Sequence, residues 1–427
     1  MWRAPFDFRK IVTMPKQAAA PDRSVPRTRV RSGDSSIDRR GRLRDAPPFL
    51  SYGFRPFFLF GSGYAALAVP LWLWTYFRGS GPAGPLSGLA WHAHEMLFGY
   101  LGAVMAGFVL TAVPNWTGRL PISGLPLAAM AGLWCVGRLA LLAHPEPLSA
   151  AFLDLLFPIM LAAAVWREIL VGRNFGNLPI ALLITLFASA NGLDHAGALV
   201  PALGGYGIRL GLAVAALMMA IVGGRVTPSF TRNWMSRAGL APLPAAMDRL
   251  DKTALMLTAG GLAGWVASPH AFVVGTVLAS AGVLLLVRLF RWRGYRTLGE
   301  PIVLVLHLGY LWLAVALLLL GLGALLPSII PTSSAIHALT AGAVGTMTLA
   351  VMTRASLGHT GRAIASDRQT NTIYVLVMLG ALFRVAAPLV ASAYIPLVVA
   401  GGLLWSVAFG LFVIAYGPML VSKRVGR

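Results

Sequence analysis

Long apolar stretches alternate with short polar segments along most of the chain. Each stretch is about 20 residues long, which is the length that an α-helix needs to cross the hydrocarbon core of a bilayer. The pattern predicts twelve membrane-spanning helices, at residues 56–77, 94–115, 125–143, 149–170, 178–199, 206–226, 252–268, 270–290, 301–326, 332–353, 372–390 and 394–416. We therefore expect an all-α polytopic membrane protein.

The composition agrees with this expectation and sets the first residues apart. Of the 427 residues, 57% are hydrophobic and only 11% are charged, which is too apolar for a domain that folds in water. Residues 1–46 are instead rich in Arg, Ser and Pro and contain no apolar signal-peptide core. They predict a disordered basic cytoplasmic tail, with Met14 as an alternative start, before a membrane domain at 47–427.

Lys and Arg indicate how the chain is oriented. Basic residues favour the cytoplasmic side of a bacterial membrane. They concentrate in the tail and in the connections that follow even-numbered spans, while the opposite connections hold essentially Arg78 alone. The basic connections contain Arg225, Arg232, Arg237, Arg249 and Lys252 in one loop and Arg288, Arg291, Arg293 and Arg296 in another. We expect both termini in the cytoplasm, and we interpret the net charge of +21 as a topology signal rather than a nucleic-acid-binding surface.

Related sequences recur at intervals of four spans, which suggests an internal repeat. Spans two, six and ten are followed by Trp116-Thr-Gly-Arg119, Phe230-Thr-Arg-Asn233 and His359-Thr-Gly-Arg362. This predicts a pseudo-threefold repeat of four helices, at about residues 55–170, 177–290 and 300–418. Recurrence of Pro, Gly and Arg at membrane boundaries is the alternative explanation. Counting 23 residues back from Thr117 and from Thr360 reaches His94 and His337, so the repeat places two histidines at equal depth.

Ionisable residues gather in the outer half of the predicted membrane domain. An isolated charge in the bilayer costs at least about 2.5 kcal/mol, so such residues should face the interior of the bundle and be paired. We therefore expect one or two buried cofactor sites in this layer. Its members are His92, His94, Glu95, Arg138, Asp154, Asp194, His195, Arg209, His337 and Arg384.

Two cofactors suit these residue types. Imidazole is a common ligand of haem iron, so we expect His94 and His337 to be the axial pair of a b-type haem. His92 points away from His94 on a helix, and with His195 and Asp194, and Met96 or Met105 as sulfur donors, it suits copper. Cys135 is the only cysteine, which excludes an internal disulfide, a thiolate zinc site and a covalently attached haem.

The arginines of the layer and a second histidine group complete the candidate sites. Arg138, Arg209 and Arg384 are natural partners for haem propionates, because guanidinium groups bind carboxylates in a bidentate manner. An Arg138–Asp154 ion pair is the alternative for the first of them. On the cytoplasmic side, His307 and His359 could hold a second metal, a second haem or a proton path, or could each bond a helix carbonyl.

Several sequence runs resemble the NnrS family of bacterial membrane proteins. They are Arg55-Pro-Phe-Phe58, Trp91-His-Ala-His-Glu-Met96, Thr111-Ala-Val-Pro-Asn-Trp-Thr-Gly118, Gly223-Gly-Arg-Val-Thr-Pro228, His307-Leu-Gly-Tyr310 and the run from His337 to Gly361. The resemblance implies a haem- and copper-containing protein of the inner membrane that is linked to nitric oxide metabolism and relief of nitrosative stress. The repeat is also similar to the core subunit of haem-copper oxidases and nitric oxide reductases, although their His-His pair on span seven is absent here.

Three functions are compatible with these features. The first is a haem b and copper protein that binds or turns over nitric oxide or another small gas, with the reaction and the electron donor left open. The second is a transporter of copper, haem or a small anion that uses the same outer-half residues. The third is a sensor that signals through its basic tail.

Overall fold

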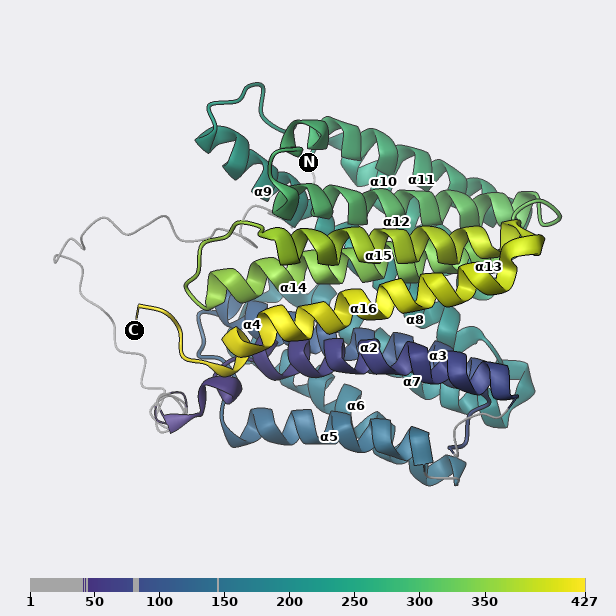
Figure 1. Cartoon of the computed structure of the whole chain (residues 1–427), viewed down its shortest axis with the longest axis horizontal. Helices are drawn as coiled ribbons and strands as arrows, with labels where there is room; N and C mark the ends of the chain where they lie inside the picture. Colours follow the sequence, from purple (N-terminus) through teal and green to yellow (C-terminus); the bar gives the residue numbers. More distant parts are fainter. Residues whose placement is uncertain (1–40, 42, 44, 80–83, 144–145, 427) are drawn as a thin grey trace, which may run out of the picture.

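The structure is a computed structural model of the whole chain, and it describes residues 41, 43, 45–79, 84–143 and 146–426. The regular secondary structure of this part is entirely helical. The helices lie side by side along the long axis of the molecule (Figure 1). Nearly all of the predicted basic tail, including Met14, lies outside the described residues.

Eleven helical segments of the described residues are long and apolar enough to cross a membrane. This confirms the prediction of a multi-pass all-α membrane protein. The segments are Phe54–Arg78, Gly88–Thr117, Leu125–Ala143, Pro147–Val171, Phe175–Leu199, Pro201–Arg237, Phe272–Arg291, Pro301–Leu325, Thr332–His359, Arg368–Leu389 and Ala391–Val421. Within them lie the single helices α2 (Phe54–Arg78), α5 (Leu125–Ala143), α6 (Pro147–Val171), α7 (Leu178–Leu199), α11 (Phe272–Arg291), α12 (Pro301–Leu325), α15 (Arg368–Ala386) and α16 (Tyr394–Val421).

The remaining predicted span, the seventh at residues 252–268, corresponds to α10 (Arg249–Ala267). This helix packs against α11 and against α8 (Tyr206–Met218), but it is not among the eleven segments. Its first turn carries Arg249, Asp251 and Lys252, which lower its hydropathy. The structure thus shows the helix where it is expected, and its crossing of the membrane stays a prediction.

Three spans change from α-helix to π-helix and back. The second span contains α3 (Gly88–His94), η3 (Glu95–Leu101) and α4 (Gly102–Thr117); the sixth contains α8, η6 (Met219–Gly223) and α9 (Gly224–Arg237); the tenth contains α13 (Thr332–His337), η8 (Ala338–Val344) and α14 (Gly345–His359). Such π-helical turns are frequent at functional sites. They occur in the three spans that the repeat places in equivalent positions.

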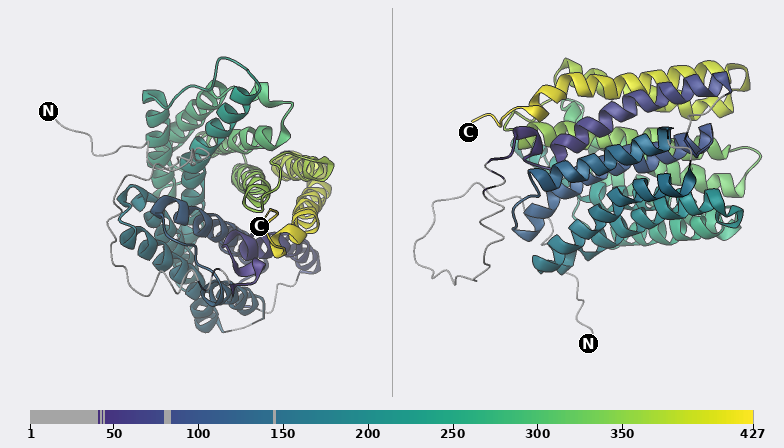
Figure 2. Two further views of the ribbon diagram at one scale, coloured as in Figure 1. Left: turned by 90° about the vertical axis from the view of Figure 1, so that its left-hand side faces the viewer. Right: turned by 90° about the horizontal axis from the view of Figure 1, so that it is seen from below.

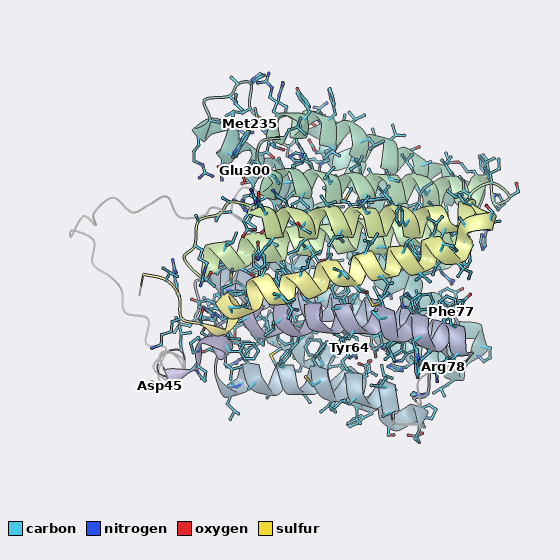
Figure 3. All side chains as sticks on the ribbon, in the orientation of Figure 1. Asp45, Tyr64, Phe77, Arg78, Met235 and Glu300 are labelled. Atoms are coloured by element: carbon cyan, nitrogen blue, oxygen red, sulfur yellow. The ribbon has the colours of Figure 1, made fainter. Side chains whose placement is uncertain are left out.

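The last span returns to the first. α16 packs along both α15 and α2, which closes the bundle, as the end-on view in Figure 2 shows. Arg55 fixes this contact, because its Nη1 donates to the carbonyl oxygens of Leu420 at 2.8 Å and Ser422 at 2.7 Å. Asp45, Met235 and Glu300 lie at one end of the bundle, and Phe77 and Arg78 lie at the other (Figure 3).

The structure corrects several predicted boundaries. The second span begins at Gly88 rather than at His94, so His94 lies inside the helix and not at its start. The sixth span continues to Arg237, so Arg225, Arg232 and Arg237 are helical rather than part of a loop. Similarly, Arg288 and Arg291 belong to α11, where they pair with Asp251 and Asp248. These arginines contribute to the fold as well as to the charge asymmetry.

Candidate metal centre

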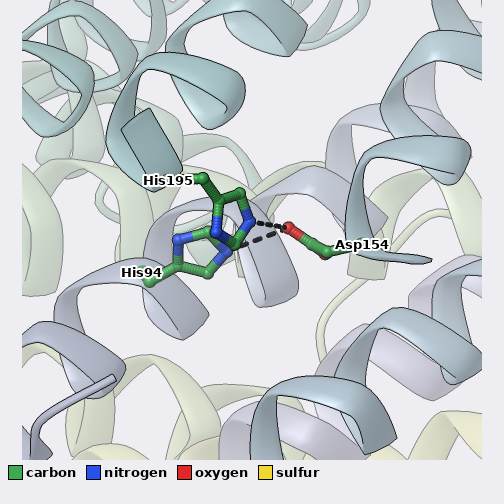
Figure 4. Close-up of side chains that lie close together, drawn as sticks. All are labelled: His94, Asp154 and His195. Carbon is green, nitrogen blue, oxygen red and sulfur yellow. Dashed lines mark hydrogen bonds and ion pairs between the residues drawn. The ribbon is translucent and has the colours of Figure 1, made fainter. Parts of the chain in front are cut away.

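Three side chains from three helices converge in the interior of the bundle. His94 ends α3, Asp154 lies on α6 and His195 lies near the end of α7, and all three are buried. Asp154 Oδ2 lies 3.1 Å from His94 Nε2 and 3.0 Å from His195 Nε2 (Figure 4). The three atoms lie within 4.8 Å of one another. Ligand atoms around one metal ion are roughly 3–4 Å apart, so this spacing suits a metal site.

Asp194 orients His94 from the other side of the ring. Its Oδ2 lies 2.8 Å from His94 Nδ1. A carboxylate that accepts the Nδ1 proton leaves the lone pair on Nε2, which is the nitrogen that faces Asp154. This arrangement is common around metal-binding histidines, whose second ring nitrogen usually donates to a carboxylate or a carbonyl.

Arg138, on α5, orients Asp154. Its Nη2 donates to Asp154 Oδ1, and its Nη1 donates to Glu95 Oε2 at 2.6 Å. The ion pair that we considered as the alternative to a propionate contact is therefore present. Gly99 makes room for it, because a side chain there would collide with Glu95 Oε2 and Arg138 Nη1. The guanidinium thus holds both carboxylates in place.

The charges of this cluster do not balance. With the carboxyl groups of Glu95, Asp154 and Asp194 all ionised and the histidines neutral, Arg138 supplies one positive charge against three negative ones, an excess of two. Glu95, Asp154 and Arg138 are almost fully buried, and Asp194 is 16% exposed. An uncompensated buried charge is very unfavourable. A divalent cation between the imidazoles, or a proton on each imidazole, would neutralise the cluster.

The structure groups the four outer histidines differently from the predicted sets. His94 contacts His195 and the carboxylates, whereas His337 lies close enough to His92 and Arg384 to interact with them electrostatically. His337 Nδ1 donates to the Ser333 carbonyl at 2.7 Å, which leaves Nε2 as a free ligand atom. His92 stacks on Trp72, with 4.3 Å between ring centroids.

This second group contains buried polar atoms that lack a partner. Among the described residues, neither His92 Nδ1 nor Arg384 Nη1 has a hydrogen-bond partner. Buried polar atoms are nearly always satisfied, so such atoms indicate a missing ligand, water or ion. We call His92, His337 and Arg384 the second histidine group.

The other candidate residues lie elsewhere. Arg209 Nε donates to the Val266 carbonyl at 3.1 Å, and its guanidinium stacks on Tyr206. His307 Nε2 lies 2.8 Å from Thr231 Oγ1, whereas His359 packs against the rings of Tyr52 and Phe54. Met105 is buried in the apolar core, and Met96 packs against that core.

Asp154 was not predicted to be a metal ligand. We placed it in the polar layer but considered it only as a partner for Arg138. Asp154 lies on α6, and its two carboxylate oxygens serve different partners. That division depends on how α3, α5, α6 and α7 pack, which no local pattern encodes.

A bundle of membrane-spanning helices with metal-ligand side chains buried between three of them defines a polytopic membrane protein with a candidate metal site. The chain belongs to the NnrS family: the family model described as NnrS protein matches residues 48–424, which is nearly the whole chain. Membership confirms the resemblance and links the chain to nitric oxide. No curated protein matches it.

Proposed function

We propose that this chain is a copper- and haem b-binding protein of the bacterial cytoplasmic membrane that binds or turns over nitric oxide and so relieves nitrosative stress. Family membership supports the link to nitric oxide. The observation that carries the metal assignment is the convergence of two buried imidazoles and a buried carboxylate at His94, Asp154 and His195.

Copper suits the candidate metal centre. Two imidazole nitrogens and one carboxylate oxygen form a donor set that divalent copper binds more strongly than the other first-row metals. Asp194 and Arg138 keep His94 Nε2 and Asp154 Oδ2 directed at a common point. Bound copper would supply one-electron chemistry and a coordination position for a small gas.

Haem b suits the second histidine group. His337 would hold the haem iron through Nε2, because the Ser333 carbonyl accepts the proton on Nδ1. His92 lies near it with an unpartnered ring nitrogen, and Arg384 offers an unpartnered guanidinium nitrogen to a propionate. We therefore assign the haem to His92 and His337 and the copper to His94 and His195. Both Nη atoms of Arg138 already contact carboxylates, so Arg384 is the better propionate partner.

We extend the proposal to the topology. Each of His94 and His337 is the last residue of a short helix and is followed directly by a π-helix of 7 residues. This equivalence supports the repeat of four helices. With α10 as a further span, the repeat has twelve members and both termini lie in the cytoplasm.

The proposal is tested by purifying the full chain in detergent from cells supplied with haem and copper. Metal analysis and oxidised and reduced visible spectra should show copper and a low-spin haem, and added nitric oxide should change the spectrum. A wild-type protein with neither cofactor would contradict the proposal. Copper or haem that exchanges freely during purification would favour the alternative, a transporter of that cofactor.

A further inference from the structure

A cluster of donors lies at the end of the bundle opposite the candidate metal centre, where α2 begins and α14 and α16 end (Figure 1). Arg55, in the first turn of α2, is only 3% exposed. The three carbonyl oxygens that its Nη1 contacts belong to Met419, Leu420 and Ser422. The guanidinium is therefore fixed between the start of one helix and the end of another.

The segment that follows α16 brings further cations to the same place. Val425 N donates to the Thr360 carbonyl at 3.0 Å, which docks this segment on the turn after α14. Gly361 adopts φ of +80° there, and a side chain on it would meet the Val425 carbonyl and the Arg424 side chain. Arg55 interacts electrostatically with Arg362, and His359 does so with both Arg424 and Arg55.

Several donors of this cluster have no acceptor. Arg55 Nε, Arg362 Nη1 and Ser422 Oγ are buried and lack a hydrogen-bond partner among the described residues. Within the same part of the chain, no ion pair joins Arg55, Arg362 or Arg424 to a carboxylate. Buried donors without partners and adjacent like charges both destabilise a fold. An anion bound between them would remove both costs.

We propose that Arg55, His359, Arg362, Ser422 and Arg424 form a binding site for a phosphate group, supplied by an anionic phospholipid or by free phosphate. Guanidinium groups bind phosphate oxygens in a bidentate manner. Basic pockets between helices at the cytoplasmic surface are suited to anionic lipid headgroups. The same positive surroundings disfavour a metal cation at His359. The site is independent of the copper and haem proposed above.

Thermal unfolding of the full chain in detergent tests this site, with phosphatidylglycerol, phosphatidylcholine and inorganic phosphate as the added probes. Arg362→Gln is the main variant, because Arg362 makes no side-chain hydrogen bond in the described part of the chain that the fold would lose. Arg249→Gln is the matched control, since it removes the same charge from an exposed position on α10. Ser422→Ala is a second variant, which removes an uncharged hydrogen-bond donor from the proposed phosphate site.

Phosphatidylglycerol should raise the unfolding midpoint of the wild type and of Arg249→Gln. The phosphatidylglycerol concentration that gives half of this stabilisation should be about tenfold higher for Arg362→Gln, because this variant loses one charge-assisted hydrogen bond to the phosphate group. Copper content should stay unchanged in all variants, so failure here is distinct from failure of the metal assignment. An equal effect of inorganic phosphate would identify a free anion as the ligand. Equal responses to phosphatidylcholine and phosphatidylglycerol, or equal responses of the two arginine variants, would overturn the proposal.

Discussion

At the scale of single residues, the candidate metal centre depends on how buried charges are balanced. Asp154 is 1% exposed and contacts two imidazoles with one oxygen and Arg138 with the other. A proton and a metal ion compete for the same lone pair on each imidazole, so metal binding should release protons and weaken in acid. The carboxylates around the site favour whichever cation occupies it.

Asp194→Asn tests the role of the residue that orients His94. The amide oxygen can still accept from His94 Nδ1, but the negative charge is lost. We expect copper affinity to fall about 10- to 100-fold, which is the usual effect of changing a group that orients a metal ligand. Competition with a chelator of known affinity measures this change. An unchanged affinity would show that Asp194 does not act on the copper site.

Gly99→Ala tests the buried pair of Glu95 and Arg138. The added methyl group would collide with both side chains and separate them. Breaking a buried ion pair costs roughly 3–5 kcal/mol, so the unfolding midpoint should fall clearly. Gly132→Ala, on the neighbouring α5, is the control because nothing lies within 4 Å of its added methyl group. Equal midpoints for the two variants would mean that the pair contributes little.

At the scale of helices, the apolar pattern was sufficient where a span is simple. The predicted limits of 125–143 and 178–199 coincide with α5 and α7. The pattern failed where amphipathic turns continue the sixth span, as in α9, or where a polar turn lies inside a helix, as in α3. Hydropathy reports transfer into the bilayer and not the hydrogen bonding that continues a helix past it.

Asp248, at the start of α10, makes part of the stability of the fold depend on pH. It accepts hydrogen bonds from Leu250 N and Asp251 N at the start of α10 and pairs with Arg291. The hydrogen bond from Arg291 lowers the pKa of this carboxyl below its usual value. A lowered pKa in the folded state means that the contribution is present above the unfolded pKa of about 3.9 and is lost as pH falls.

Asp248→Asn should therefore remove a part of the stability that the wild type loses only in acid. The amide keeps an acceptor for the helix end but loses the attraction to Arg291. We expect the variant to unfold at a lower temperature at pH 6 and the difference to shrink as pH falls below 4. Thermal unfolding across this range measures it, and a difference that grows in acid would contradict the assignment.

The site was predictable as a layer of residues but not as a set of contacts. The depth of His92, His94, His195 and His337 followed from their positions along the spans. Their grouping did not, because it depends on how each helix is rotated about its axis. The π-helical turn after His94 alters that rotation. No feature of the residues Glu95–Leu101 predicts a π-helix.

At the scale of the molecule, α10 decides the topology. If it crosses the membrane, the chain has an even number of spans and both termini share one side. We expect reporter fusions after Arg78 and after Ser268 to behave as periplasmic, with alkaline phosphatase active at both. A fusion at the C-terminus should instead make green fluorescent protein fluoresce in the cytoplasm. A cytoplasmic Ser268 fusion would show eleven spans and would contradict the repeat.

The packing of α16 against α2 makes the bundle a closed unit. The two proposed sites, the metal-ligand side chains and the cationic cluster, then lie at opposite ends of it. This separation predicts that the two sites can be lost independently, as the unchanged copper content of Arg362→Gln would show.

The copper content of His195→Ala tests the central claim most directly. His195 contacts Asp154 through one nitrogen, so its removal takes a ligand from the centre and leaves the Arg138 contacts in place. His270→Ala, at an exposed position between α10 and α11, is the matched control. We predict stoichiometric copper in the wild type and in His270→Ala and its loss from His195→Ala. Equal copper in all three proteins would contradict a metal site at His94, Asp154 and His195.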